Sequence, residues 1–299
     1  MSPDVYKEEA RYVWGVCYRM TGSAPDADDL VQETFQRALE SPPEETTAPW
    51  RPWLVRVAVN LARDKLRRRR HAAYTGPWLP SPIETDDAVA PDEDQERRYG
   101  MMESVSYAFL VAAEALTPRQ RAVLLLRDVF DYSVREAAET LTLSHANVKT
   151  TLHRARAAMV AYDLGRTVPT LALQRRTRAA LESFATSLLT GDLAAVELLL
   201  AESVHTVNDG GGEFRAALRV VRGRGRVARF YLGLAKRLGP PGGYAVRMLN
   251  GLPALVLAYP GAKGRIAPRS VLRCDIDAEG RIACLHTVLA TAKLRGIRV

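Results

Sequence analysis

The chain has 299 residues, with 42 Lys and Arg against 34 Asp and Glu, and 47% of its residues are hydrophobic. That length predicts two or three compact units, and the hydrophobic share is ordinary for a soluble globular protein. No apolar run approaches the roughly 20 residues that span a bilayer, and the first residues lack the layout of a secretory signal, so we expect neither a membrane span nor secretion.

The three cysteines, Cys17, Cys274 and Cys284, are odd in number and far apart in the sequence. No group of Cys and His residues has the spacing of a zinc site. We therefore expect a protein of the reducing cytoplasm that holds no structural metal and no cofactor.

The net charge of +8 is unevenly distributed along the chain. Residues 1–169 hold 22 basic and 25 acidic residues, whereas residues 170–299 hold 20 basic and 9 acidic ones. The overall positive charge is therefore no argument for DNA binding by residues 1–169. Local clusters of charge are informative instead. Residues 51–70 carry eight basic residues and one acid, and residues 84–96 carry seven acids and no base. The acidic run is expected to be a solvated linker.

Residues 1–73 are predicted to be helical, because apolar residues recur at spacings of three and four. The stretch TGSAPDADD interrupts this pattern: Gly22 and Pro25 end one helix, and the Asp residues favour the first turn of the next. SPPEETTAP at 41–49 is predicted to be a loop, and a long amphipathic helix is predicted over about 52–70.

The helix over 52–70 carries a polar and basic surface beside its apolar one. Such a surface can neutralise DNA phosphates while an amide or an aromatic ring catches an unstacked base. Loop 41–49, which ends at Trp50, is the natural place for a pocket that receives a flipped base, whereas Trp53 is expected in the core. The DNA-facing residues predicted on this segment are Trp50, Arg56, Asn60, Arg63, Lys65 and Arg67.

Residues 74–98 are rich in Pro and acid and are predicted to be an irregular linker. Helical periodicity returns over 99–163. There, Thr117 begins a helix with Pro118 in its first turn.

Two further helices follow in a helix-turn-helix arrangement. Ser133 and Glu136 form a capping box for the first, and the second begins at about His145. Asn and Lys side chains suit base edges, whereas Thr, His and Arg suit bases or phosphates. The outward positions of this recognition helix are His145, Asn147, Lys149, Thr150, His153, Arg154 and Arg156.

After a second joint around Pro169, the pattern becomes mixed. Helices are predicted at about 173–190, 192–201 and 224–238, and a strand-like VHTVN leads into the glycines of NDGGGE. Four β segments follow, YAVRML, ALVLAYP, SVLRCDID and RIACLHTVLA, with AEG as a hairpin turn between the last two. Residues 170–299 are therefore predicted to form a separate α+β domain.

Three motifs in order, DADDLVQETFQRAL (26–39), WLVRVAVNLARDKLRRRR (53–70) and VKTTLHRAR (148–156), resemble sigma-70-type initiation factors of the small extracytoplasmic-function (ECF) group. The resemblance covers about residues 1–165. It implies an all-α region 2 bundle over 1–73 and an all-α region 4 helix-turn-helix over 99–165, joined by the linker 74–98.

The resemblance also implies function and partners. Region 2 would bind core RNA polymerase and open and read the −10 element, and region 4 would read the −35 element. The partners would be the β′ clamp and β flap of the polymerase and promoter DNA, with one sigma copy per polymerase and a monomer when free. The polymerase-binding positions carried over are Asp28, Asp29, Leu30, Gln32, Glu33 and Phe35.

The linker and the third domain sharpen the resemblance. YTGPWLPSP (74–82), NDGGGE (208–213) and NGLPA (250–254) resemble motifs of ECF sigma factors that carry a C-terminal SnoaL-like domain, a cone-shaped α+β barrel. Ser81 replaces the usual acid, Glu213 replaces the usual base, and the tail matches only at Lys293-Leu294. The implied regulatory contact between the domains involves Trp78, Pro80, Asp209, Gly210, Gly211 and Gly212.

We therefore expect a sigma factor, not an enzyme, whose domain over 170–299 regulates it in cis, with the glycine loop near the segment from Trp78 to Pro82. The glycines are not a phosphate loop, because no Gly-Lys-Ser/Thr follows them. What they supply is positive φ and room for close approach of another segment.

Other functions stay open at this stage. The third domain could bind a small molecule or be catalytic, through His205, Asp209, Tyr231, Tyr259, Asp275 and His286. The chain could also be a conventional helix-turn-helix regulator, and a small molecule or an anti-sigma factor could act as a further regulator.

Overall fold

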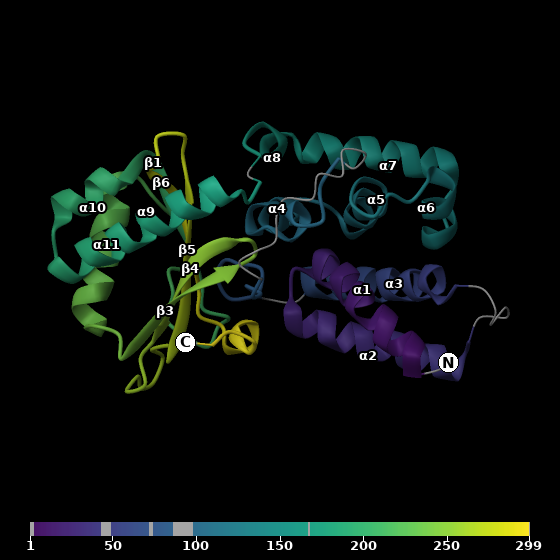
Figure 1. Ribbon diagram of the computed structural model, residues 1–299, viewed down its shortest axis with the longest axis horizontal. Helices are drawn as coiled ribbons and strands as arrows, with labels where there is room; N and C mark the ends of the chain where they lie inside the picture. The colour runs from purple at the N-terminus through teal and green to yellow at the C-terminus, as the bar shows by residue number, and fades with distance from the viewer. Residues whose placement is uncertain (1–2, 43–48, 72–73, 86–97, 167, 299) are drawn as a thin grey trace. The chain divides into compact units, whose positions relative to one another are not determined.

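A computed structural model of the chain describes residues 3–42, 49–71, 74–85, 98–166 and 168–298 (Figure 1). The chain divides into two compact units, one made of residues 1–73 and 91–168 and the other of residues 74–90 and 169–299. Residues 43–48 of the predicted flipped-base loop (41–49) and residues 86–96 of the acidic run (84–96) lie outside the described residues.

The first unit begins with three helices, α1 (Pro3–Thr21), α2 (Ala24–Glu40) and α3 (Trp50–His71). The predicted break between α1 and α2 is present, since Gly22 has a φ of 65°. Ser23 then caps α2 by accepting a hydrogen bond from the amide of Asp26 at 3.3 Å. The three helices contact one another and pack together through their apolar faces.

The same unit continues with η1 (Glu103–Val105), α4 (Tyr107–Ala113), α5 (Pro118–Asp128), α6 (Val134–Leu141), α7 (His145–Ala158) and α8 (Val160–Leu164). Complete capping boxes begin α5 and α6, and the second is the one predicted at Ser133 and Glu136. Thr142, with a φ of 53°, ends α6 in the left-handed conformation, so that α7 can start three residues later.

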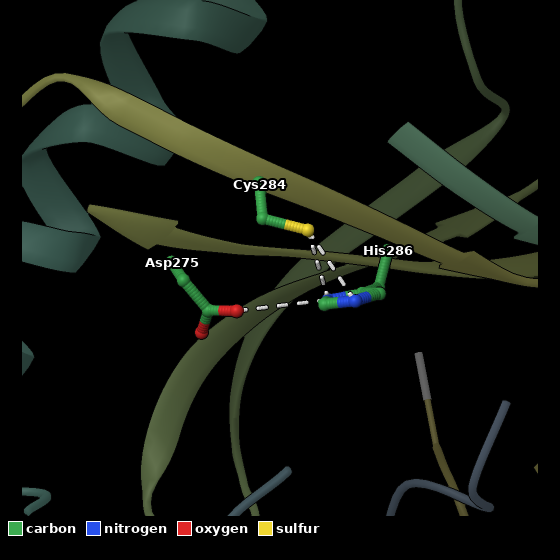
Figure 2. Close-up of side chains that lie close together, drawn as sticks. All are labelled: Asp275, Cys284 and His286. Atoms are coloured by element: carbon green, nitrogen blue, oxygen red, sulfur yellow. Dashed lines mark hydrogen bonds and ion pairs between the residues drawn. The ribbon is translucent and has the colours of Figure 1, made fainter. Parts of the chain in front are cut away.

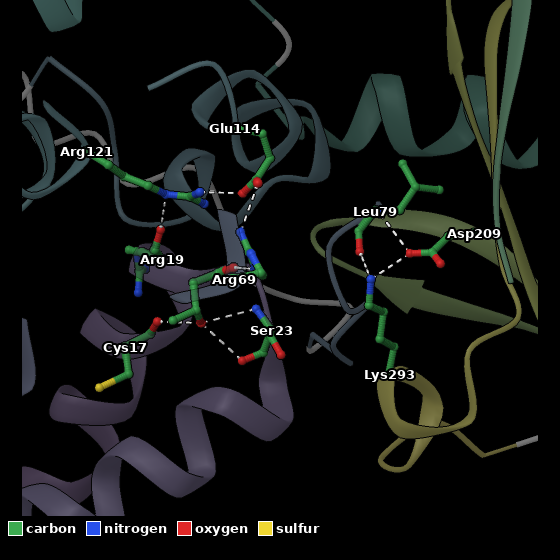
Figure 3. A network of polar contacts seen from close by, with 10 residues as sticks. Cys17, Arg19, Ser23, Arg69, Leu79, Glu114, Arg121, Asp209 and Lys293 are labelled. Carbon is green, nitrogen blue, oxygen red and sulfur yellow. Dashed lines mark hydrogen bonds and ion pairs between the residues drawn. The ribbon is translucent and has the colours of Figure 1, made fainter. Parts of the chain in front are cut away.

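Buried arginines join these two groups of helices within the first unit (Figure 3). Arg19 on α1 donates to Ser104 Oγ at 2.7 Å and to the Met101 carbonyl at 2.8 Å. Arg121 on α5 donates in turn to the Arg19 carbonyl at 3.0 Å. Guanidinium groups suit this role because one side chain can satisfy several carbonyl and hydroxyl acceptors.

The second unit is α+β, as predicted. Its elements are α9 (Leu171–Thr190), α10 (Leu193–Leu199), β1 (Leu200–Asp209), β2 (Val221–Arg222), α11 (Arg224–Leu238), β3 (Gly243–Leu249), β4 (Leu252–Ala258), β5 (Arg269–Ile276), β6 (Ile282–Val288) and η2 (Thr291–Leu294). They form one six-stranded sheet of order β2-β1-β6-β5-β4-β3. Strands β3 to β6 are the predicted meander, but β1 is parallel to β6, a pairing that the sequence pattern did not reveal.

The two faces of the sheet differ. Helices α9, α10 and α11 cover one face, where Phe184, Val204, Tyr231, Leu272 and Leu285 belong to a buried apolar core. Because side chains alternate along each strand, the intervening residues of β1, β5 and β6 point to the other face. Among the described helices, none combines the length and hydropathy that crossing a membrane requires.

Candidate functional site

The recognition helix α7 exposes most of the residues predicted to face DNA. Its apolar side, Val148, Leu152 and Ala155, is buried, and α5 and α6 are its neighbours. The Ser144 hydroxyl caps the helix by accepting from the amide of Asn147 at 3.2 Å. The predicted residues that are exposed are His145, Asn147, Lys149, Thr150, His153 and Arg154.

Arg156, the seventh predicted residue, keeps 41% of its side chain exposed but is also bound to the fold. Its guanidinium donates two hydrogen bonds to Asp128 on α5, from Nε at 2.9 Å and from Nη2 at 2.6 Å. The Asp128 side chain is 1% exposed. The hydrogen bond to Asp128 raises the pKa of Arg156, and the ion pair ties α7 to α5.

Helix α3 presents a mixed surface. Arg56 and Arg67 are exposed, whereas Asn60 and Arg63 are half-buried and joined to each other at 3.0 Å. Trp50 stands edge-on to Trp53 with 6.3 Å between the ring centroids, and both rings are half-buried.

Lys65, another residue predicted to face DNA, lies in an ion pair within the bundle. Its ammonium group is 2.9 Å from Asp26 and 3.1 Å from Asp29, both on α2. One residue predicted to meet DNA and one predicted to meet the polymerase are therefore partners of each other in this structure.

On α2, the polymerase-binding prediction divides by exposure. Asp28, Asp29 and Gln32 are exposed and Glu33 is half-exposed. Leu30 and Phe35 are only 2% and 4% exposed, since they pack into the core of the bundle. The prediction is therefore corrected for these two residues, which hold the helix in place and offer no surface to a partner.

A buried carboxylate, Asp209 at the end of β1, organises the linker residues of the second unit (Figure 3). It is 0% exposed. Its oxygens accept hydrogen bonds from the Tyr74 hydroxyl at 2.6 Å, the Leu79 amide at 2.8 Å and the Gly211 amide at 2.9 Å. Residues 74–85 thus pack on the third domain beside the glycine loop.

Lys293 completes this arrangement, which we call the linker clamp: Tyr74, Trp78, Leu79, Asp209 and Lys293. The Lys293 ammonium group donates to Asp209 at 2.6 Å and to the Leu79 carbonyl at 2.6 Å. It also lies 4.2 Å from the centroid of the Trp78 ring, which satisfies a cation on an aromatic face. In the sequence, only the tail match at Lys293-Leu294 hinted at this residue.

The linker continues as a short strand-like addition beside the β3–β4 hairpin. Its turn is Asn250-Gly251, with φ values of 53° and 82°, the pair that a tight hairpin favours. The backbone groups of Asn250 and Ile83 pair at 3.0 Å, and the Asn250 side chain accepts from the Ile83 amide at 3.2 Å. The Thr85 amide donates to the Met248 carbonyl at 2.9 Å.

The glycine loop itself needs small residues for close approach. A Cβ on Gly211 would lie 2.7 Å from Cβ of Ala290, and one on Gly210 would lie 2.5 Å from the Phe214 carbonyl oxygen. Gly211 and Gly212 also have φ values of 60° and 76°. Any larger residue would push apart the contacts that position Asp209.

A cavity of about 550 Å³ lies on the helix-covered side of the sheet. Tyr231 and Tyr259 line it, but the other four residues proposed for such a pocket do not. Burial raises the pKa of Tyr231 to about 12, and its hydroxyl is bonded to Thr206 at 2.8 Å and Thr287 at 3.0 Å. No Asp, Glu or His appears among the described lining residues.

Asp275, Cys284 and His286 lie close together on the opposite side of the sheet (Figure 2). Cys284 Sγ lies 3.3 Å from His205 Nε2 and 3.8 Å from His286 Nδ1, which is 3.8 Å from Asp275 Oδ2. Burial lowers the pKa of His286 to about 4 and raises that of the Cys284 thiol. Sequence spacing could not reveal this cluster, since its members come from three strands.

Comparison with known proteins decides the family. The models of sigma-70 region 2 and sigma-70 region 4 match residues 5–72 and 107–159. The ECF RNA polymerase sigma factor SigJ of Mycobacterium tuberculosis is 33% identical over 295 residues, which cover 96% of this chain and 91% of SigJ. The chain belongs to the ECF sigma factor family.

Other similarities agree with this result. The crystal structure of SigJ matches with a TM-score of 0.74 and 28% identity over 99% of both chains, so the likeness includes the α+β domain. SigG of the same species is 40% identical over 164 residues, which are 48% of this chain and 43% of SigG.

The expected fold class and the expected role as a sigma factor are thereby confirmed. This ECF sigma factor binds core RNA polymerase and promoter DNA and directs transcription initiation. Its helical domains are those of regions 2 and 4, and its C-terminal domain carries the clamp, the cavity and the polar cluster.

Proposed function

We propose that the C-terminal domain of this sigma factor restrains initiation in cis by holding the linker between regions 2 and 4. The observation that carries the proposal is the linker clamp. Asp209 and Lys293, both on the C-terminal domain, bind the backbone of Leu79 from its two sides, the amide and the carbonyl.

Region 2 and region 4 must read two separate promoter elements at once, so the linker between them must be free to adapt. A clamped linker has fewer arrangements open to it. The clamp is intramolecular, which gives it a high effective concentration, so even a modest contact populates the clamped state. Polymerase and promoter would favour the released state through their higher affinity for it.

Opening the linker clamp would cost free energy, but it would leave Asp209 with partners in its own domain, as a reversible switch requires. Asp209 is fully buried, and a buried carboxylate is tolerated only with good partners. If the linker leaves, Asp209 loses the Leu79 amide and the Tyr74 hydroxyl, but it keeps Lys293 and Gly211 within its own domain. Release therefore costs energy without leaving the charge uncompensated.

We assign the surfaces of the helical domains by exposure. The six exposed polar residues of α7 would read the −35 element, and Arg56 and Arg67 of α3 would meet −10 DNA. The polar edge of α2, with Asp28, Asp29, Gln32 and Glu33, would meet the polymerase. The alternative for each surface is a solvated helix face that binds neither DNA nor polymerase.

We also propose that the C-terminal domain is not an enzyme and that the protein works in the cytoplasm, where its polymerase is. Acid–base catalysis needs a proton-transferring group at the substrate. The described lining of the cavity offers hydroxyls, an amide and arginines but no carboxylate or imidazole.

The experiment is promoter-directed transcription with core polymerase. It compares the full chain with Asp209→Ala, Tyr74→Phe and a truncation after Arg166. Restraint in cis predicts higher initiation for the truncation, a smaller rise for Asp209→Ala and the smallest for Tyr74→Phe. Glu279→Ala, an exposed acid in the β5–β6 turn, is the matched control and should behave as the full chain does.

Equal transcription with and without residues 170–299 would sink the proposal. Lower transcription after truncation would instead assign the basic C-terminal domain to contacts with upstream DNA or polymerase. Binding of each variant to core polymerase, measured separately, shows whether a change arises before or after holoenzyme assembly.

A further inference from the structure

The strand registers place five polar residues side by side on the face of the sheet opposite α9, α10 and α11. His205 of β1, Cys284 of β6 and Asp275 of β5 occupy one transverse row, because Cys284 pairs with each of the other two. His286 and Arg273 form the next row along the same face. The backbone therefore enforces this juxtaposition before any side chain is considered.

We infer that His205, Asp275, Cys284 and His286 form a tetrahedral site for a thiophilic divalent cation, with Zn²⁺ as the best fit. The ligand atoms are His205 Nε2, Asp275 Oδ2, Cys284 Sγ and His286 Nδ1. Asp275, Cys284 and His286 already offer ligand atoms that lie within 4.8 Å of one another (Figure 2).

The distances suit a four-coordinate metal. Zinc bonds of about 2.0–2.3 Å in a tetrahedron place neighbouring ligand atoms roughly 3.3–3.6 Å apart. The thiol of Cys284 lies 3.3 Å from His205 Nε2 and 3.8 Å from His286 Nδ1, and that nitrogen lies 3.8 Å from Asp275 Oδ2. The ligand atoms of Asp275, Cys284 and His286 already lie within 4.8 Å of one another, and the imidazole of His205, whose Nε2 reaches Cys284, would turn toward the other two to complete the tetrahedron.

The donor set selects the metal. One sulfur, two imidazoles and one carboxylate suit zinc, whereas calcium and magnesium prefer oxygen ligands. Cys284 and His286 are 7% and 5% exposed, while Asp275 and His205 are partly exposed and leave a route for the ion.

Arg273 supports the site from outside. It donates to Asp275 Oδ1 at 2.8 Å, which leaves Oδ2 directed toward His286. Its other nitrogen, Nη1, lies 3.4 Å from His286 Nδ1, and a metal would take over that position. Carboxylate ligands of metals are commonly held by such outer hydrogen bonds.

The test uses the full-length chain, stripped with a chelator and titrated with Zn²⁺ and with Co²⁺. We expect one ion per chain, and a cobalt spectrum with tetrahedral intensity and a thiolate charge-transfer band. Cys284→Ala should abolish that band and weaken Zn²⁺ binding more than about 100-fold, and Arg273→Gln should weaken it about 10- to 100-fold. Cys274→Ala, on the helix-covered face, is the matched control and should change neither.

Absence of stoichiometric Zn²⁺ binding at micromolar metal would overturn the inference, as would an unchanged cobalt band in Cys284→Ala. X-ray absorption of the zinc-loaded wild-type chain tests it without any variant that must fold. One sulfur among four ligands supports the site, and any other sulfur count contradicts it. Since the readout is metal binding, its result is independent of cis regulation.

Discussion

Arg154 and Arg156 lie two residues apart on the recognition helix, yet their surroundings are opposite. Arg154 is exposed, whereas Arg156 holds the buried carboxylate of Asp128 with two hydrogen bonds. Both are basic residues of one helix, and the sequence pattern treats them alike. The two arginines therefore differ in partners: Arg154 is exposed on the helix surface, whereas Arg156, 41% exposed, is paired with a buried carboxylate.

The first prediction uses that pair. Arg156→Ala leaves Asp128 buried without its cation and should lower the free energy of unfolding by about 1.5–3 kcal/mol, as expected for a lost hydrogen bond to a charged group. Arg154→Ala should leave stability within about 0.5 kcal/mol and reduce the salt dependence of promoter binding by about one unit of slope.

Urea unfolding and promoter binding by the holoenzyme at several salt concentrations measure the two effects. A stable Arg156→Ala with weakened, less salt-dependent promoter binding would mean that Arg156 faces DNA after all. Loss of stability in Arg154→Ala would contradict its assignment as a free surface residue.

Among the elements, the two-residue turn between β3 and β4 holds linker residues 83–85 in place. Asn250 does two jobs there: it adopts a φ of 53° for the hairpin, and its side chain accepts the Ile83 amide. Glycine can perform the first job but not the second, because it has no side chain. The two roles can therefore be separated by a single substitution.

We predict that Asn250→Gly keeps the β3–β4 hairpin while loosening the linker. The hairpin should change in stability by no more than about 1 kcal/mol, since glycine suits the turn. Amides of residues 83–85 should exchange with solvent several-fold faster in hydrogen–deuterium exchange. Unchanged exchange at 83–85 would show that the side chain of Asn250 does not hold the linker, and Asn250→Ala, which strains the turn, is the destabilised comparison.

Elements differ in how far the sequence predicted them. Capping residues marked the starts of α5 and α6, and α11 was predicted with the bounds that it has, because helices are defined by near neighbours in the chain. The strand β1 was seen, but its parallel pairing with β6 was not. That pairing joins residues about 80 positions apart, and nothing in a local pattern encodes it.

In the molecule as a whole, each of the two compact units is built from two separate segments of the chain. Residues 74–90 belong to the second unit although their neighbours on both sides belong to the first. The chain therefore enters the second unit twice, once at residue 74 and once at residue 169. The joint near residue 168 is thus not the only connection between residues 169–299 and the rest of the chain. Asp209 and Lys293 provide the second tie through Leu79.

A protease site inserted between Val168 and Pro169 tests this second tie. After cleavage, the two fragments should still elute together in size-exclusion chromatography at micromolar concentration, because segment 74–85 stays attached to the first fragment and bound to the second. Asp209→Ala combined with Lys293→Met should lower the fraction that elutes together. Separation of the unmodified fragments would contradict the clamp.

The sequence by itself determined the family, the helical domains, the α+β class of the third domain and the exposed polar row of α7. These features depend on residue type and local spacing, which a single chain displays directly. Tertiary structure alone decided that Leu30 and Phe35 are core, that Arg156 pairs with Asp128, that Lys293 binds the linker, and that Asp275, Cys284 and His286 meet with His205 beside Cys284. Each of those facts depends on which distant residue lies opposite, and strand pairing and helix packing supply that answer only once the chain is folded.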